Sequence, residues 1–271
     1  MRRFMSVAAA LALTLVAADV QATVLFEENI DNMSLGPVPA GSTTTGNGSW
    51  TPGTSGGTVD VVTDPTSAGR GQVIEFDDSS ASGVTRLQAH LEQTSTDELL
   101  LTYDIYNPGD DANGSFINEA VRLYSSTFLV SVYTLWNNNE LKVYSNARTG
   151  LQARTVADSL TTDRWYRMEL IVPDLVGQNL NVAETYAMKL TDLSTGDVVF
   201  AGDDLQFYDS QAANYNEYRF DQTGNDFIQR TYHDNFLITT EIPEPATLGL
   251  LGLGLGTLLC RRSCSRQAVA G

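Results

Sequence analysis

The chain has 271 residues, with 16 Lys and Arg against 33 Asp and Glu, so its formal net charge is −17 at pH 7. A polyanion repels other polyanions, which excludes nucleic acid and anionic lipid as expected partners. This charge suits divalent cations, or simple solubility outside a cell. Both cysteines, Cys260 and Cys264, lie near the C-terminus. The rest of the chain is therefore expected to have no disulfide and to depend on its hydrophobic core.

Residues 1–22 are typical of a secretory signal peptide. Arg2 and Arg3 supply the positive start, residues 4–18 the apolar run, and Val20-Gln21-Ala22 the small-x-small cleavage pattern. The mature chain is therefore expected to begin at Thr23. The alternative is a membrane anchor, but the apolar run is shorter than the roughly 20 residues that a spanning helix needs.

The exported part opens with the segment VLFEENID, residues 24–31, which is the first predicted strand. Phe26 would pack inward, and Glu27 and Glu28 would be acidic neighbours beside it. From 34 to 57 the chain is rich in Gly, Ser, Thr and Pro. This composition predicts a long surface loop.

Alternating apolar and polar residues predict strands through most of the remaining chain. In residues 99–106, for example, Leu99, Leu101, Tyr103 and Ile105 share one face. The same pattern recurs at 128–136, 165–172 and 185–190. With about a dozen short strands and no internal linker, residues 23–241 are expected to form one all-β domain, an antiparallel β-sandwich of the jelly-roll type.

Three tyrosines lie on the more polar faces of their predicted strands. Tyr106, Tyr124 and Tyr133 fall opposite the most apolar face of each strand, and so does Arg122. A sheet face that combines aromatic rings with polar groups can stack on sugar rings and bind their hydroxyls. We therefore predict these four residues as ligand-binding. The alternative is that they are scattered surface residues, or core residues of a second sheet.

Catalytic motifs are absent from the sequence, and we predict no catalytic residue. The acidic pairs Asp77-Asp78, Asp110-Asp111 and Asp203-Asp204 are adjacent in sequence. Adjacent residues of a strand point to opposite faces, so each pair is a poor acid/base couple. The histidines are His90 and His233, and no motif marks either as catalytic.

The segment TYHDNFLI, residues 231–238, places an acid in the last predicted strand. By alternation Tyr232, Asp234 and Phe236 share the inward face. An inward carboxylate must be paired or bind a metal. First and last strands are often neighbours in jelly rolls, so Asp234 could meet Glu27 or Glu28 and hold a structural Ca²⁺. The alternative is that Asp234 caps the backbone or pairs with an arginine.

The layout resembles the concanavalin A-like, or laminin G-like, sandwiches. The matching residues are Phe26-Glu27-Glu28 at the opening, Trp165-Tyr166 in an internal strand and Asp234-Asn235 at the close. The resemblance implies the sandwich fold and a structural calcium near the opening and closing strands, consistent with Asp234 and Glu27 or Glu28. The catalytic Glu-x-Asp-x-x-Glu pattern of laminarinase-type enzymes of this fold does not occur.

Residues 242–271 form a terminal signal in three parts. Pro243-Glu244-Pro245 is followed by an uncharged apolar run at 246–260 and then by Arg261, Arg262 and Arg266. This order resembles the PEP-CTERM sorting signal of Gram-negative bacteria. The resemblance implies an exosortase-type membrane protease as partner, transient contact with the inner membrane, and delivery to the cell surface or matrix after removal of the tail. A plain C-terminal anchor is the alternative.

Taken together, these features predict an exported, non-catalytic surface or matrix protein that binds or structures extracellular polysaccharide. Two alternatives stay open. One is a divergent glycoside hydrolase or polysaccharide lyase of the same fold, and the other is a purely structural matrix protein without a ligand.

Overall fold

The computed structural model describes residues 23–41, 45–46, 48–66, 68–78, 84–95, 98–108, 118–125, 130–137, 139–145, 151–173, 185–208, 214–223 and 229–240. The expected signal peptide and the sorting signal lie outside these ranges. Residues Thr23–Thr240 form one compact unit. None of the described residues belongs to a helix with the length and hydropathy of a membrane span.

In the part of the chain that the structure describes, the secondary structure is almost entirely β, as predicted, with one short 3-10 helix, η1 (Ile30–Asn32). The strands are β1 (Val24–Glu27), β2 (Gly36–Pro37), β3 (Thr45–Gly46), β4 (Gly48–Thr54), β5 (Thr58–Thr63), β6 (Gln72–Asp78), β7 (Val84–Ser95), β8 (Leu99–Asn107), β9 (Asn118–Tyr124), β10 (Val130–Asn137), β11 (Glu140–Ser145), β12 (Gln152–Ala157), β13 (Arg164–Val172), β14 (Thr185–Asp192), β15 (Val198–Gln206), β16 (Tyr215–Thr223) and β17 (Gln229–Thr239).

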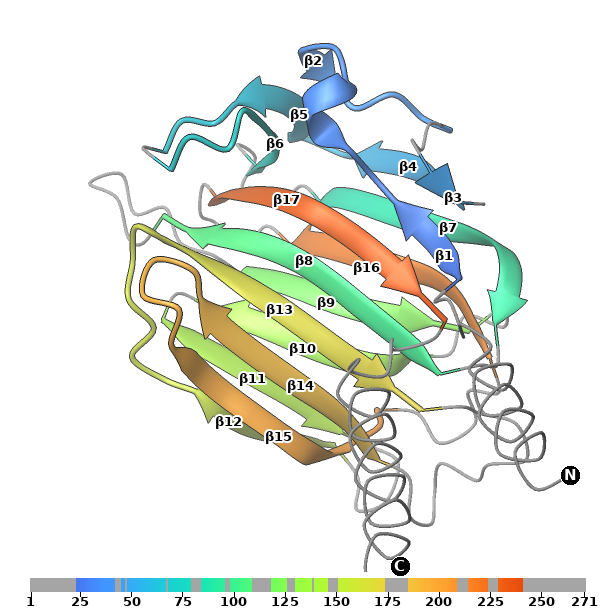
Figure 1. Cartoon of the computed structure of the whole chain (residues 1–271), viewed down its shortest axis with the longest axis vertical. Coiled ribbons are helices and arrows are strands. Elements are labelled where there is room, and N and C mark those ends of the chain that lie inside the picture. Colours follow the sequence, from blue (N-terminus) through green and yellow to red (C-terminus); the bar gives the residue numbers. More distant parts are fainter. Residues whose placement is uncertain are drawn as a thin grey trace, which may run out of the picture. The chain divides into compact units, whose positions relative to one another are not determined.

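Two antiparallel sheets stack face to face in a β-sandwich (Figure 1), which confirms the predicted fold class. The ten-stranded sheet runs β15-β14-β13-β8-β17-β6-β5-β2; in addition β1 pairs with β17, and β3 pairs with β1. The seven-stranded sheet runs β12-β11-β10-β9-β16-β7-β4. The first and last strands, β1 and β17, pair antiparallel as expected.

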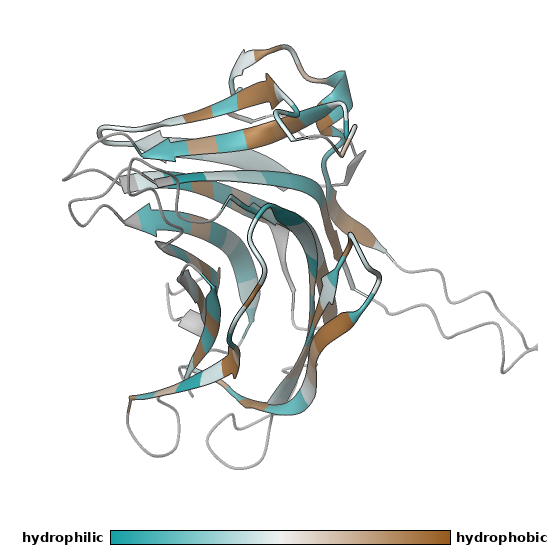
Figure 2. Cartoon of the chain, turned by 90° about the vertical axis from the view of Figure 1, so that its left-hand side faces the viewer, coloured by the Kyte–Doolittle hydropathy of each residue, from teal (hydrophilic) through white to brown (hydrophobic). Residues whose placement is uncertain are grey.

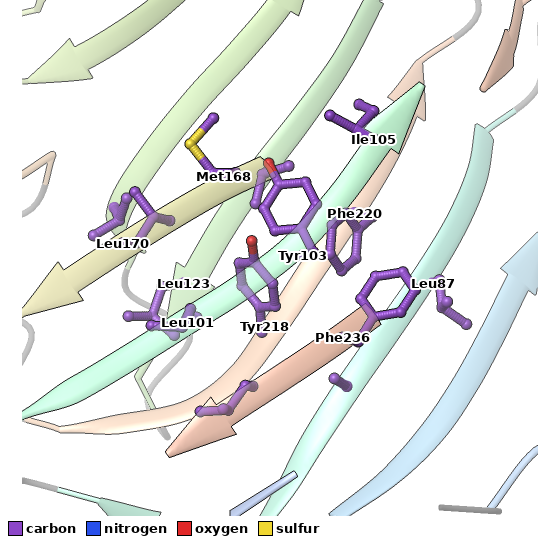
Figure 3. Close-up of a cluster of buried hydrophobic side chains, with 14 of the residues drawn as sticks. Leu87, Leu101, Tyr103, Ile105, Leu123, Met168, Leu170, Tyr218, Phe220 and Phe236 are labelled. Carbon is purple, nitrogen blue, oxygen red and sulfur yellow. The ribbon is translucent and has the colours of Figure 1, made fainter. Parts of the chain in front are cut away.

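The core lies between the two sheets, and the period-two pattern identified many of its residues. Leu99, Leu101, Tyr103 and Ile105 of β8 are all buried, at 1% exposure or less. Hydrophobic and hydrophilic residues alternate along the strands in Figure 2. Figure 3 shows Tyr103 beside side chains from the facing sheet, among them Tyr218 and Phe220, in the same cluster. Burial of these side chains supplies the main stabilisation of a domain that has no cysteine.

A cluster of hydrogen-bonded polar side chains lies within this apolar core and connects the two sheets. His233 of β17 and Glu119 of β9 are fully buried, and His233 Nε2 lies 2.9 Å from Glu119 Oε2. Thr231 donates to the same carboxylate oxygen at 2.9 Å. The histidine therefore links the two sheets from within the core.

The predicted loop at 34–57 is wrong in part, because this stretch includes the edge strand β4. Pairing with β7 places Trp50 opposite Ala89 and Pro52 opposite Leu87. An edge strand pairs on one side only, so it tolerates a proline that has no N–H to donate. Trp50 anchors the strand, since its ring is fully buried against Phe26 at a centroid distance of 4.6 Å.

The last strand changes face in its middle, which corrects the predicted orientation of Asp234. Asp234 pairs with Asp104 of β8, but Leu237 is already opposite Thr102. Two residues of β17 therefore oppose one residue of β8, and Asn235 adopts a positive φ of 54°. Such a bulge shifts the alternation by one residue. As a result Phe236 faces the core, whereas Asp234 lies on the outer face of the sheet.

Candidate functional site

The outer face of the seven-stranded sheet carries a continuous row of polar and aromatic side chains. Pairing registers align Gln88, Arg219, Arg122, Tyr133 and Tyr144 across the five strands β7, β16, β9, β10 and β11. Their strand neighbours on either side point into the core, so period-two alternation places the row on the outside.

The tyrosines of this face form a stacked group. Tyr133 and Tyr144 are directly opposite each other on β10 and β11, with ring centroids 4.8 Å apart and an interplanar angle of 23°. Tyr208, from the segment after β15, meets Tyr133 edge-on at 5.4 Å. Stacked, partly exposed rings offer the flat apolar surface that a sugar ring can cover.

Arginines lie beside these rings. The Arg122 guanidinium sits over the Tyr133 ring at 4.6 Å and donates to its hydroxyl at 3.3 Å. Arg219 sits over Tyr124 in the same way, at 4.3 Å. Burial alone would lower the pKa of Arg122, but the hydrogen bond to Tyr133 and the charge of Asp221 outweigh it and raise that pKa. The guanidinium is therefore charged at every working pH.

Two carboxylates lie beneath the arginines. Asp221 has no exposed side-chain surface and is contacted by both Arg86 and Arg122, the latter at 2.7 Å. Glu217, whose side chain is 5% exposed, accepts from Arg219 Nε at 2.7 Å and Gln88 Nε2 at 2.9 Å. The acids hold the guanidinium groups in place and are themselves shielded from solvent.

The outer face of the ten-stranded sheet carries a second aromatic row, made of Trp165, Tyr106 and Tyr232 on β13, β8 and β17. Their rings lie 5.5 and 6.0 Å apart in that order. Trp165 is almost fully covered, at 3% exposure, because the Arg70 guanidinium sits over it at 4.2 Å. A pocket of about 530 Å³ adjoins this row, and its lining includes Tyr106 and Asp163.

Arg70 also joins an ion-pair network on this sheet. It donates to Asp104 at 2.7 Å and to Asp234 at 2.9 Å. Arg167 donates to Asp104 as well, through Nε at 2.7 Å and Nη2 at 3.0 Å. Burial raises the pKa of the Asp234 carboxyl, although Arg70 acts in the opposite direction. The network ties the β5–β6 loop to β8, β13 and β17.

These contacts give Asp234 a positively charged partner, Arg70, which compensates the charge of the carboxylate without a metal ion. Asp234 and Glu27 line the same pocket, of about 540 Å³, but Arg70 and Arg167 line it too. Glu28 accepts a hydrogen bond from Trp50 Nε1 at 2.8 Å. Among the described residues no group of three or more His, Cys, Asp and Glu side chains could hold a metal ion. The calcium predicted at Asp234 with Glu27 or Glu28 stays a prediction.

The structure brings together three of the four predicted ligand-binding residues. Arg122, Tyr124 and Tyr133 share the outer face of the seven-stranded sheet, whereas Tyr106 lies on the outer face of the other sheet. Sequence reasoning missed Arg219 and Tyr144. The signal was present for Tyr144, since Leu141 and Val143 alternate with it in ELKVYS.

Comparison with known proteins identifies the C-terminal signal. The model of the PEP-CTERM protein-sorting motif matches residues 241–263, which contain Pro243, Glu244 and Pro245. This motif implies export and cell-surface sorting, with processing by an exosortase. No curated protein matches the chain.

Solved structures share the fold at low sequence identity. A carbohydrate esterase from the Shiga toxin-encoding bacteriophage phi24B has a TM-score of 0.53 at 12% identity, covering 82% of this chain and 100% of its own. The lectin UEA-II, solved with galactose, has a TM-score of 0.50 at 10% identity, covering 83% of this chain and 100% of its own. These likenesses show the fold alone. The chain thus carries a PEP-CTERM sorting motif that follows, in sequence, a β-sandwich domain with lectin-like structural neighbours.

Proposed function

We propose that this protein is exported to the surface or extracellular matrix of a Gram-negative bacterium, where it binds or organises polysaccharide without catalysing a reaction on it. The signal peptide at 1–22 would direct export, and an exosortase-type protease would process the tail. The observation that carries the binding proposal is the stacked pair Tyr133 and Tyr144, flanked by Arg122 on the outer face of the seven-stranded sheet.

The chemistry of this face supports recognition of sugars. Each partly exposed ring can cover the apolar face of a pyranose, while the arginine N–H groups and the Gln88 amide can bond to hydroxyl oxygens. The sorting motif supports the same proposal, because a protein delivered outside the cell meets the surface polysaccharide directly. The sugar-binding and sugar-modifying proteins of this fold add an analogy only.

The acids of this face are poorly placed for glycoside hydrolysis, which supports a non-catalytic role. Glu217 and Asp221 are four residues apart on one strand, so their Cα atoms are about 13 Å apart at 3.3 Å per residue. Hydrolases place their two carboxyl groups about 5–9.5 Å apart. Both carboxylates are also engaged by arginines. We therefore expect no release of reducing sugar from common α- or β-glucans.

A glycan array with the purified full-length protein tests the proposal, followed by titration of the best ligand with two variants. Tyr133→Ala should weaken binding about tenfold, since loss of a stacked ring costs about 1.5 kcal/mol. Tyr106→Ala makes the same change on the opposite sheet and should leave binding unaltered. If only Tyr106→Ala weakens binding, the site lies on the ten-stranded sheet. If no glycan binds at all, a purely structural role replaces the proposal.

A further inference from the structure

We infer that the polysaccharide bound by the seven-stranded sheet is anionic, carrying carboxylate or sulfate groups. The inference rests on the proposed function and names the class of ligand for the same face. Its basis is a local excess of positive charge in a chain whose net charge is −17.

The ion pairs of this face do not balance. Among the side chains that the structure describes, three arginines, Arg86, Arg122 and Arg219, contact two carboxylates, because Arg86 and Arg122 share Asp221. Within this described set, one positive charge is left over. The network on the ten-stranded sheet differs, since Arg70 and Arg167 are matched there by Asp104 and Asp234.

The excess positive charge lies toward solvent, because the carboxylate is buried more deeply than the arginines that contact it. The Asp221 side chain is completely buried, whereas those of Arg86 and Arg122 are 33% and 20% exposed. The carboxylate therefore sits below the guanidinium groups and cannot meet the ligand. A ligand approaching this face meets cations first, and their charge acts in a partly desolvated setting where it is less screened than in water.

The arginines also have donors to offer. A guanidinium carries five N–H donors in a planar fork that matches carboxylate and other oxyanions. The contacts of Arg122 with Asp221 and Tyr133 use two of its nitrogens and orient the plane of the group. The stacked tyrosines adjoin it, so a sugar ring on Tyr133 would bring its charged substituent within reach of Arg122.

A second cationic position lies along the same face. Leu135 is opposite Lys142, one pleat from the pair of Tyr133 and Tyr144. Lys142 contacts Glu140 at 2.6 Å, so this position is balanced and adds no excess. The inference therefore depends on the arginine cluster and not on the lysine.

The test compares charged and neutral polymers of matched backbone. Binding of the full-length protein is measured by calorimetry to polygalacturonate, to its carboxyl-reduced form, and to a sulfated and an unsulfated galactan. We expect at least one charged polymer to bind about tenfold or more tightly than its neutral partner. That preference should shrink as salt rises from 50 to 500 mM, conditions under which exposed charges are screened.

Arg122→Gln removes the charge and keeps hydrogen-bonding groups, so it should reduce the preference for the charged polymer about tenfold. Arg154→Gln is the matched control, because Arg154 lies opposite the buried Val143 and pairs with Asp204 of the other sheet. Equal affinity for charged and neutral polymers would overturn the inference and leave the proposed function standing. Loss of the preference in Arg154→Gln, or its retention in Arg122→Gln, would also overturn it. If no polymer binds, the proposed function itself fails.

Discussion

Replacement of Asp104 by Asn should destabilise the domain more than any change to a surface ion pair. The Asp104 side chain has no exposed surface and accepts hydrogen bonds from Arg70, Arg167 and Asn235. An asparagine keeps one acceptor oxygen but turns an N–H₂ group toward two guanidinium groups. The arginines would then lose their buried counter-charge.

The size of the effect follows from burial. Breaking a buried ion pair costs about 3–5 kcal/mol. Arg70 and Arg167 are 16% and 40% exposed, so water partly screens them and the lower end applies. We therefore expect Asp104→Asn to lower the free energy of unfolding by about 3 kcal/mol. For a domain of this size, that corresponds to a fall of about 6–12 °C in Tm.

Urea and thermal unfolding, each followed by circular dichroism, measure this difference. Asp204→Asn is the matched control, since Asp204 is 66% exposed and pairs with Arg154 at 3.0 Å. Exposed pairs contribute at most about 1 kcal/mol. If Asp104→Asn costs no more than Asp204→Asn, the network does not hold the β5–β6 loop to the sheet and this reasoning is wrong.

Three further predictions concern the tail, calcium and pH. If Pro243-Glu244-Pro245 is processed, intact mass of the surface form will lack residues 248–271, whereas full mass would indicate a plain anchor. If Ca²⁺ binds at Asp234, EDTA should lower Tm by several degrees relative to millimolar CaCl₂, and Asp234→Ala should show no such difference. Coincident wild-type unfolding curves would leave arginine as the counter-charge of Asp234. Burial opposes ionisation of Asp192, but Arg164 and backbone N–H groups outweigh it and lower its pKa below 3.8. This stabilisation is present above pH 3.8 and lost as pH falls through the lowered pKa. Asp192→Asn should therefore destabilise the protein at pH 7, and its deficit in urea unfolding should shrink in acid; a deficit independent of pH would contradict this.

Local chemistry was enough to predict the β-sandwich and the sorting signal. Alternation along β8 identified Leu99, Leu101, Tyr103 and Ile105 as core residues, because a strand in a sandwich buries every second side chain. The Pro-Glu-Pro motif, the apolar run and the arginines are contiguous in sequence, so that signal needs no fold to be read. The outward direction of Tyr133 followed from the same alternation.

Contacts between residues far apart in sequence determined the orientation of Asp234 and the composition of the candidate site. The bulge at Asn235 moved Asp234 to the outer face, and no local pattern shows a two-for-one pairing with another strand. Arg70 became its partner from a position 164 residues away. Pairing order likewise determined that Tyr133 meets Tyr144 and Arg122 while Tyr106 lies on the other sheet. Alternation gives the face of each strand, but only the tertiary pairing of strands determines which side chains share a surface.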